Sequence, residues 1–198
     1  MTCKYFIALL YALLLIMLTG NAFAGGQISL SYATGNKTYF SFVIPDDWKV
    51  NVGFEANVAE MPDGEKPKPR LITLMPNDIS RLWFGMWVPD SVSNMHEATE
   101  YLRQFRGFFV DNPVTTKTVE SKVNGMDVTT VIGEGERNGE KVDIAVVVFQ
   151  LTKENMGIAI YIGSAESTKL HRDELNAIVH SIHPAGKFDK AQSFGVSR

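Results

Sequence analysis

The chain has 198 residues, 21% of them charged, and a formal net charge of −3. This length suits one domain with a substantial hydrophobic core. The mildly acidic balance gives no electrostatic reason to expect nucleic acid or anionic lipid as a partner. Because Cys3 is the only cysteine, an intramolecular disulfide is excluded, and stability must come from apolar burial.

Residues 1–24 have the features of a cleavable secretory signal peptide. Lys4 precedes an unbroken apolar run from Tyr5 to Leu18, and small side chains at Ala22 and Ala24 suit signal peptidase. The run is shorter than the roughly 20 apolar residues of a spanning helix, which favours removal over retention as an anchor. We therefore predict a periplasmic or secreted protein, cleaved after Ala24, with no stable membrane anchor afterwards.

The mature chain is predicted to open with a flexible segment, followed by a strand. Residues 25–35 are expected to be the flexible N-terminus. Apolar and polar residues then alternate from Thr38 to Ile44, which predicts a half-buried strand, and Pro45-Asp46-Asp47 predicts a turn. We expect Trp48, directly after this turn, to plug the end of a sheet.

Two further strands are expected from Phe54 to Met61 and from Arg70 to Met75. The connection from Pro62 to Pro69 is charged and contains prolines that cannot join a ladder, so it is predicted to be a mobile loop. Lys66 and Lys68 in this loop are candidate contact residues for a partner.

A strand rich in tryptophan is the best candidate for binding. From Leu82 to Val88, successive side chains alternate between the two faces of a predicted strand, and both faces are expected to be covered. Trp83 and Trp87 flank Gly85 on one face, which predicts a flat aromatic surface with a gap that another chain or a ligand could approach. The alternative is core packing, with a helix filling the gap.

An amphipathic helix is predicted to follow, with Ser93 as its N-cap and a break at Asn112-Pro113. Its apolar residues recur at helical spacing: Met95, Ala98, Leu102, Phe105 and Phe109.

The next segment predicts an antiparallel meander. Asn124-Gly125 and Asn138-Gly139 each suit a two-residue hairpin turn, because both central residues need positive φ. The expected strands are Thr115 to Val123, Met126 to Glu134 and Lys141 to Leu151. The turns fix a register that pairs opposite charges, Lys122 with Asp127 and Glu136 with Lys141.

The remaining elements complete an α+β fold. The uniformly apolar stretch from Ile144 to Phe149 predicts a central strand buried on both faces, and Gly157 to Gly163 predicts another strand. A second helix is expected from near Ser167 to His183-Pro184, before a flexible tail, 185–198. We predict a single domain, 36–184, with one antiparallel sheet of about seven or eight strands flanked by two main helices.

This order of elements resembles the PsbP-like superfamily, which includes the photosystem II extrinsic protein P and bacterial DcrB-type envelope proteins. The resemblance rests on the opening strand and turn, Phe40-Ser41-Phe42-Val43-Ile44-Pro45-Asp46-Asp47-Trp48, and on a closing helix from Leu175 to Pro184. It implies an α/β/α sandwich that binds proteins or stabilises assemblies. The matching motifs are not catalytic, so the resemblance provides no catalytic residue.

Candidate chemistry is sparse. His171, His180 and His183 cannot converge on one ion from a straight helix, although His180 and His183 alone could form a weak i, i+3 metal pair. The alternative is that these histidines sit favourably at a helix C-terminus. No Gly-x-Ser-x-Gly, Ser-x-x-Lys or His-Glu-x-x-His motif is present.

The sequence therefore favours an exported, non-enzymatic binding or assembly factor of the bacterial cell envelope that needs no cofactor. Its expected partner is a protein or envelope component and not nucleic acid, and the candidate contacts are Trp83, Gly85, Trp87, Lys66 and Lys68. Two alternatives stay open: a metal-binding protein or metal-dependent hydrolase that uses His180 and His183, and a periplasmic immunity protein against a secreted toxin.

Export can be checked directly on the protein that accumulates in producing cells. We expect a mature N-terminus at Gly25, because signal peptidase cleaves after the small residue Ala24. Intact-mass measurement and N-terminal sequencing of the envelope and cytosolic fractions would reveal it. Full-length protein in the cytosolic fraction would overturn the prediction.

Overall fold

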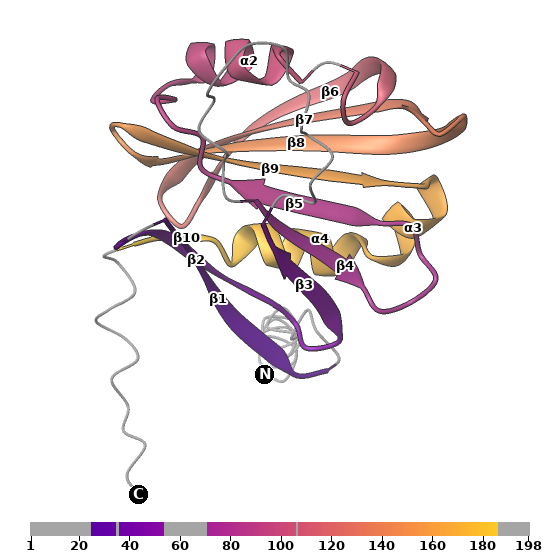
Figure 1. Ribbon diagram of the computed structural model, residues 1–198, viewed down its shortest axis with the longest axis horizontal. Helices are drawn as coiled ribbons and strands as arrows, with labels where there is room; N and C mark the ends of the chain where they lie inside the picture. The colour runs from indigo at the N-terminus through magenta and orange to yellow at the C-terminus, as the bar shows by residue number, and fades with distance from the viewer. Residues whose placement is uncertain (1–24, 35, 54–70, 106, 186–198) are drawn as a thin grey trace, which may run out of the picture.

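The computed structural model describes residues 25–34, 36–53, 71–105 and 107–185. It consists of three layers, with a seven-stranded sheet in the middle (Figure 1). Helix α2 (Met95–Arg103) covers one face. Helix α4 (Arg172–His180) and a three-stranded sheet cover the other face. No helix among the described residues has the length and apolar character needed to cross a membrane.

Both sheets are antiparallel. The smaller sheet has the order β1-β2-β10, with β1 at Gln27–Thr34, β2 at Lys37–Pro45 and β10 at His183–Pro184. The larger sheet has the order β3-β4-β5-β9-β8-β7-β6. Its strands are β3 (Trp48–Val52), β4 (Ile72–Pro76), β5 (Trp83–Trp87), β6 (Asp111–Val123), β7 (Met126–Arg137), β8 (Glu140–Thr152) and β9 (Asn155–Gly163).

Strands β8 and β9 lie at the centre of the sheet and are buried on both faces, as their apolar sequences predict. Side chains alternate across a strand, so each face of β8 has its own cover. Val148 packs with Val92 and Ala98 on the α2 face. Phe149 meets Phe40 of β2 edge-to-face on the other side, with ring centroids 5.5 Å apart. The predicted two-sided burial is confirmed.

The hairpin registers predicted from the two Asn-Gly turns are confirmed. Asn124 and Asn138 both have positive φ, at 50° and 55°. Lys122 opposes Asp127, with Nζ 2.5 Å from Oδ1, and Glu136 opposes Lys141. The register of β6 shifts at two points nearer its N-terminal end, where irregularities break the ladder.

Helix α2 begins one residue later than predicted. Asn94 is the N-cap, because its Oδ1 accepts a hydrogen bond from the Glu97 backbone N–H at 3.0 Å. Ser93 instead donates from both its backbone N–H and its hydroxyl to Glu97 Oε2. These bonds lower the pKa of Glu97 below its ordinary value. The helix ends at Arg103, and the chain continues in turns through Phe105 and Phe108.

Four further predictions need correction. Residues 27–34 of the predicted flexible N-terminus form β1, because pairing with β2 buries Tyr32. The strands form two sheets and not one. Strand β2 belongs to the small sheet, which covers the lower face of the large sheet (Figure 1). Trp48, the predicted plug, is buried but begins strand β3. The closing helix is interrupted at His171, which separates α3 (Ala165–Leu170) from α4.

Other predicted segments lie outside the described residues. These are the leader 1–24, the strand from Phe54 to Met61, the loop from Pro62 to Pro69, and residues 186–198 of the expected tail.

Close packing at the centre of the sheet can be tested with one methyl group. A Cβ at Gly157 would overlap the buried ring of Phe149, which itself packs on Phe40. We expect Gly157→Ala to lower the free energy of unfolding by about 1–3 kcal/mol, measured by urea denaturation. Gly163→Ala on the same strand is the control, because its Cβ would be 3.5 Å from Ser167 Cβ in ordinary contact. Equal losses in the two variants would contradict this packing argument.

Candidate binding surface

An aromatic cluster covers strand β5 on the α2 face of the large sheet. Its members are Trp83, Trp87, Tyr101, Phe105, Phe108 and Phe109. Phe109 lies against both tryptophans, with ring centroids 5.7 Å from Trp83 and 6.2 Å from Trp87. Trp87 is buried, whereas Trp83 is half-buried. Trp83 and Trp87 therefore share one face of β5, as predicted, but residues that follow α2 cover this face.

The gap predicted at Gly85 is not open. The indole of Trp83 folds over Gly85, so that a Cβ built at Gly85 would overlap the Trp83 ring. Gly85 is needed here because a larger residue would displace this indole. The predicted flat surface with a gap is therefore wrong, and core packing describes Gly85 and Trp87.

The C-terminal end of helix α2 and the turn after it contribute the second half of the aromatic cluster. Tyr101 of α2 and Phe105 of the turn have ring centroids 5.0 Å apart. The Trp87 Nε1–H donates to the Tyr101 hydroxyl at 3.2 Å, which ties the helix to the sheet. Burial raises the pKa of Tyr101, although this hydrogen bond opposes the shift.

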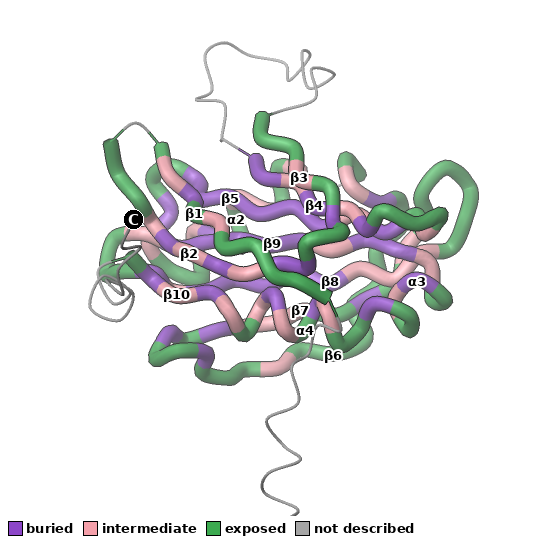
Figure 2. Tube along the Cα trace, turned by 90° about the horizontal axis from the view of Figure 1, so that it is seen from below, coloured by how far each residue is buried: buried purple, intermediate pink, exposed green. Residues whose placement is uncertain are grey.

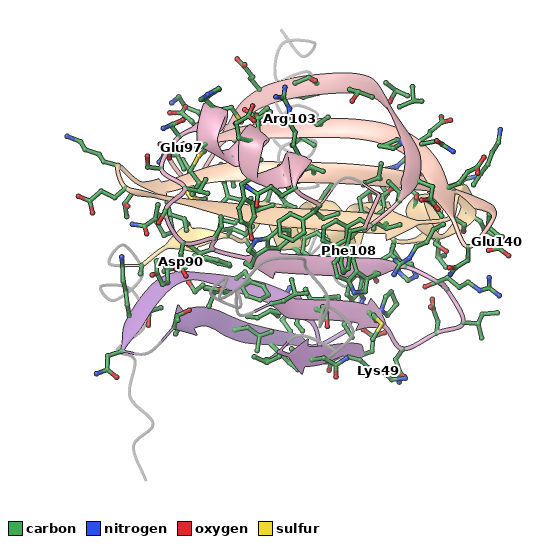
Figure 3. The ribbon with its side chains drawn as sticks, turned by 45° about the horizontal axis from the view of Figure 1, so that its top comes forward. Lys49, Asp90, Glu97, Arg103, Phe108 and Glu140 are labelled. Atoms are coloured by element: carbon green, nitrogen blue, oxygen red, sulfur yellow. The ribbon has the colours of Figure 1, made fainter. Side chains whose placement is uncertain are left out.

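Phe108 is the exposed member of the aromatic cluster (Figure 3). Its ring packs edge-to-face on Phe109, with centroids 5.0 Å apart, yet half of the residue, 50%, is exposed to solvent. Gly107 has φ of +79°, a conformation that favours glycine, and this turn places Phe108 beyond the helix. We define the binding surface as Phe108, the half-buried Trp83 and the half-buried rings of Phe105 and Phe109.

The other sequence candidates do not join this surface. Lys66 and Lys68 lie outside the described residues. His183 Nδ1 lies 2.8 Å from the Ser181 carbonyl oxygen, and His180 is exposed on α4. Across the described ranges there is no group of three or more His, Cys, Asp or Glu side chains that could hold a metal ion.

The structure reveals a polar cluster that the sequence did not indicate. His171, between α3 and α4, is buried, with its ring edge-to-face on Trp48 at 5.8 Å. Its Nδ1 lies 2.6 Å from Glu174 Oε2, and its Nε2 lies 2.9 Å from Asp78 Oδ2 and 3.2 Å from Ser80 Oγ. The cluster therefore joins the β4–β5 loop to the last helix.

This cluster has the connectivity of a nucleophile, a base and an orienting acid in the order Ser80, His171, Glu174. However, Asp78 is closer than Ser80 to the nitrogen that would act as the base. Each ring nitrogen of His171 therefore faces a carboxylate, and Nε2 is shared between Asp78 and Ser80 instead of being held for the serine hydroxyl alone. The arrangement is that of a buried polar link between loop and helix.

Only part of the polar cluster could be predicted from sequence. His171 and Glu174 are separated by one helical turn, and His171 lies close to the apolar side of its helix. Asp78 is 93 residues away from His171, and no local sequence signal indicates their contact.

Comparisons with known proteins support the fold assignment. No family model and no curated protein sequence matches the chain. Among solved structures, the cyanobacterial PsbP protein CyanoP from Synechocystis sp. PCC 6803 matches with a TM-score of 0.55 and 10% identity, covering 84% of this chain and 95% of CyanoP. The described part of this chain has the PsbP-like fold.

Two other matched structures are more distant. LpqN of Mycobacterium tuberculosis, described as involved in cell envelope biogenesis, has a TM-score of 0.49 and 10% identity over 80% of this chain and 90% of LpqN. PA94 of Pseudomonas aeruginosa, a putative regulator of unknown function, has a TM-score of 0.46 and 12% identity over 79% of this chain and 96% of its own. At these identities the likeness concerns the fold alone.

The polar cluster leads to a prediction about acid stability. Desolvation acts to raise the pKa of Asp78, but hydrogen bonds from Ser80 and the neighbouring His171 outweigh it, so the pKa is lowered. A carboxyl whose pKa is lower in the folded state contributes stability above its unfolded pKa of about 3.9, and this contribution disappears as the pH falls through the folded pKa. We expect Asp78→Asn to be less stable than wild type near neutral pH, with a difference that shrinks below about pH 4.

Urea unfolding of both proteins between acidic and neutral pH would measure this difference. Ile79→Ser in the same loop is the control, because Ile79 is fully exposed and does not titrate. A difference for Asp78→Asn that stayed constant down to the acid end would show that its charge does not stabilise the fold.

Proposed function

We propose that this protein is an exported, non-enzymatic domain of the bacterial cell envelope that binds a protein partner through the surface centred on Phe108. The observation that carries the proposal is a half-exposed aromatic ring supported by a cluster of buried and half-buried aromatic rings. The PsbP-like fold contributes the scaffold, and the predicted leader peptide contributes the compartment.

The position of Phe108 suits a binding anchor. A ring that is half exposed in the free domain gains further apolar burial when a partner covers it. Its packing on Phe109, with rings nearly perpendicular at 87°, restricts the ring before binding, so less conformational entropy is lost on association. Aromatic anchors of this kind often carry a large share of interface energy.

The chemistry of the described residues supports binding over catalysis. Of the described side chains, Ser80, His171 and Glu174 come nearest to a catalytic arrangement. However, the Asp78 carboxylate contacts His171 Nε2, the ring nitrogen that Ser80 would need as its base. The hollow of about 380 Å³ beside Glu134 and Asp143 is open, and its lining combines charged residues with apolar ones such as Val114 and Val142. Neither feature supports a general base with access to a substrate.

The proposal can be tested by photo-cross-linking in the producing cells. Benzoylphenylalanine at position 108 should capture a specific envelope protein, because it replaces one aromatic ring by another at an exposed site. The same probe at Leu170, which is exposed on α3 at a distance in the fold, is the matched control. The captured protein would then be identified by mass spectrometry and purified.

Binding of the purified partner is the decisive measurement. We expect Phe108→Ser to weaken binding at least about tenfold while changing the free energy of unfolding by less than about 0.5 kcal/mol. Phe109→Ala should instead lower stability by about 3 kcal/mol, because it removes the ring between the tryptophans. Equal binding by wild type and Phe108→Ser would contradict the proposed surface. Hydrolysis of generic ester, phosphate or peptide substrates that is lost in Ser80→Ala would contradict the non-enzymatic role.

A further inference from the structure

Strand β1 lies at the edge of the small sheet, and within the described ranges no strand pairs with the outer side of its residues from Gln27 to Ser31. Two contacts show which of its groups face away from β2. The Asp46 N–H donates to the Gly26 carbonyl at 3.1 Å, which places the even-numbered residues of β1 in the hydrogen-bonded positions opposite β2. Val43, which opposes Ser29, instead directs its N–H and carbonyl toward the Ser181 hydroxyl on the other side of β2.

The alternation therefore points the backbone groups of the intervening residues Gln27, Ser29 and Ser31 outward, away from β2. These three residues are exposed as well. Figure 2 shows the colour for exposed residues along much of β1. Among the described residues, β2 is the only strand that pairs with β1. Edge groups of this kind are a template for another strand.

The edge strands of the large sheet, as far as the structure describes it, differ from β1 in their protection. Strand β6 carries Pro113, Lys117 and Lys122 and has two register irregularities, all features that hinder pairing with another strand. Strand β3 is only five residues long and carries Lys49. Strand β1 has eight residues without a charge or a proline, and its register is regular from Gln27 to Tyr32.

We propose that β1 pairs with β1 of a second copy of this chain, forming a two-fold dimer with a continuous six-stranded sheet. A two-fold axis perpendicular to the sheet keeps the inner faces of both copies on one side, so each residue must oppose one of the same parity. An axis at Ser29 satisfies this condition. Ser29 then opposes Ser29 of the second copy, and Gln27 opposes Ser31 in both directions.

This register uses the groups that the fold leaves at the edge. All three opposing pairs have outward-facing N–H and carbonyl groups, which allows about six main-chain hydrogen bonds. Between them, Ile28 opposes Leu30 of the second copy on the inner face, where apolar side chains approach closely. Ile28 is 40% exposed in the single chain, so this contact would bury it further. No charge on β1 opposes the association.

The interface is small compared with stable dimers, so we expect a reversible, concentration-dependent association. Sedimentation velocity of the exported, purified protein over a wide concentration range measures it. We expect a monomer–dimer equilibrium for the wild type. Ser29→Lys and Ser29→Glu should each be monomeric, because the register places two like charges directly opposite each other.

Mixing the two variants supplies the sharpest test. Equal amounts of Ser29→Lys and Ser29→Glu should restore association, since opposite charges then face each other. Thr118→Lys on the exposed β6 edge is the matched control and should associate like the wild type. Thermal unfolding of each variant checks that β1 remains folded.

Several outcomes would overturn the proposal. If the wild type remains monomeric at all concentrations, the proposed dimer does not form. If the monomer instead binds an added strand-forming peptide at β1, the partner of this edge is a foreign strand and not a second copy. Dimers that persist in both Ser29 variants place the contact elsewhere. Failure of these tests leaves the Phe108 surface unaffected, because α2 and β1 lie on opposite sides of the large sheet (Figure 1).

Discussion

The structure depends on the two-sided burial of the central strands β8 and β9. Neighbouring residues of β8 such as Val147, Val148 and Phe149 are all buried, so the large sheet needs a cover on each face. Cys3 is the only cysteine, so no disulfide within the chain can staple these layers, and apolar packing must hold them. The α2 layer and the layer formed by α4 with the small sheet are therefore both required for a stable core.

The requirement for a cover also explains the aromatic surface. The segment after α2 must bury Trp87 and most of Trp83, and Phe109 does this by lying against both rings. A short turn at Gly107 then leaves the adjacent Phe108 at the border of the core. The residue proposed to bind a partner is thus held by the same aromatic cluster that stabilises this side of the sheet.

Polar side chains connect the layers where apolar packing ends. His171 links the β4–β5 loop to the last helix through Asp78 and Glu174. Asn124, in the β6–β7 turn, donates through its side-chain amide to the carbonyl oxygens of His180, the last residue of α4, and of Ile182 just after it. Within the described part of the chain, no comparable link reaches the outer edge of β1 from Gln27 to Ser31, which is the physical origin of its proposed role.

The sequence by itself determined features set by neighbouring residues: strand and helix periodicity, the Asn-Gly turns and the hairpin registers that follow from them. It also indicated the two-sided burial of Ile144 to Phe149 and thereby the central strand. Only the tertiary structure decided the separate three-stranded sheet, the filling of the Gly85 gap and the His171–Asp78 contact. These depend on segments far apart in the chain, whose meeting is set by the packing of whole layers and leaves no local periodicity to detect.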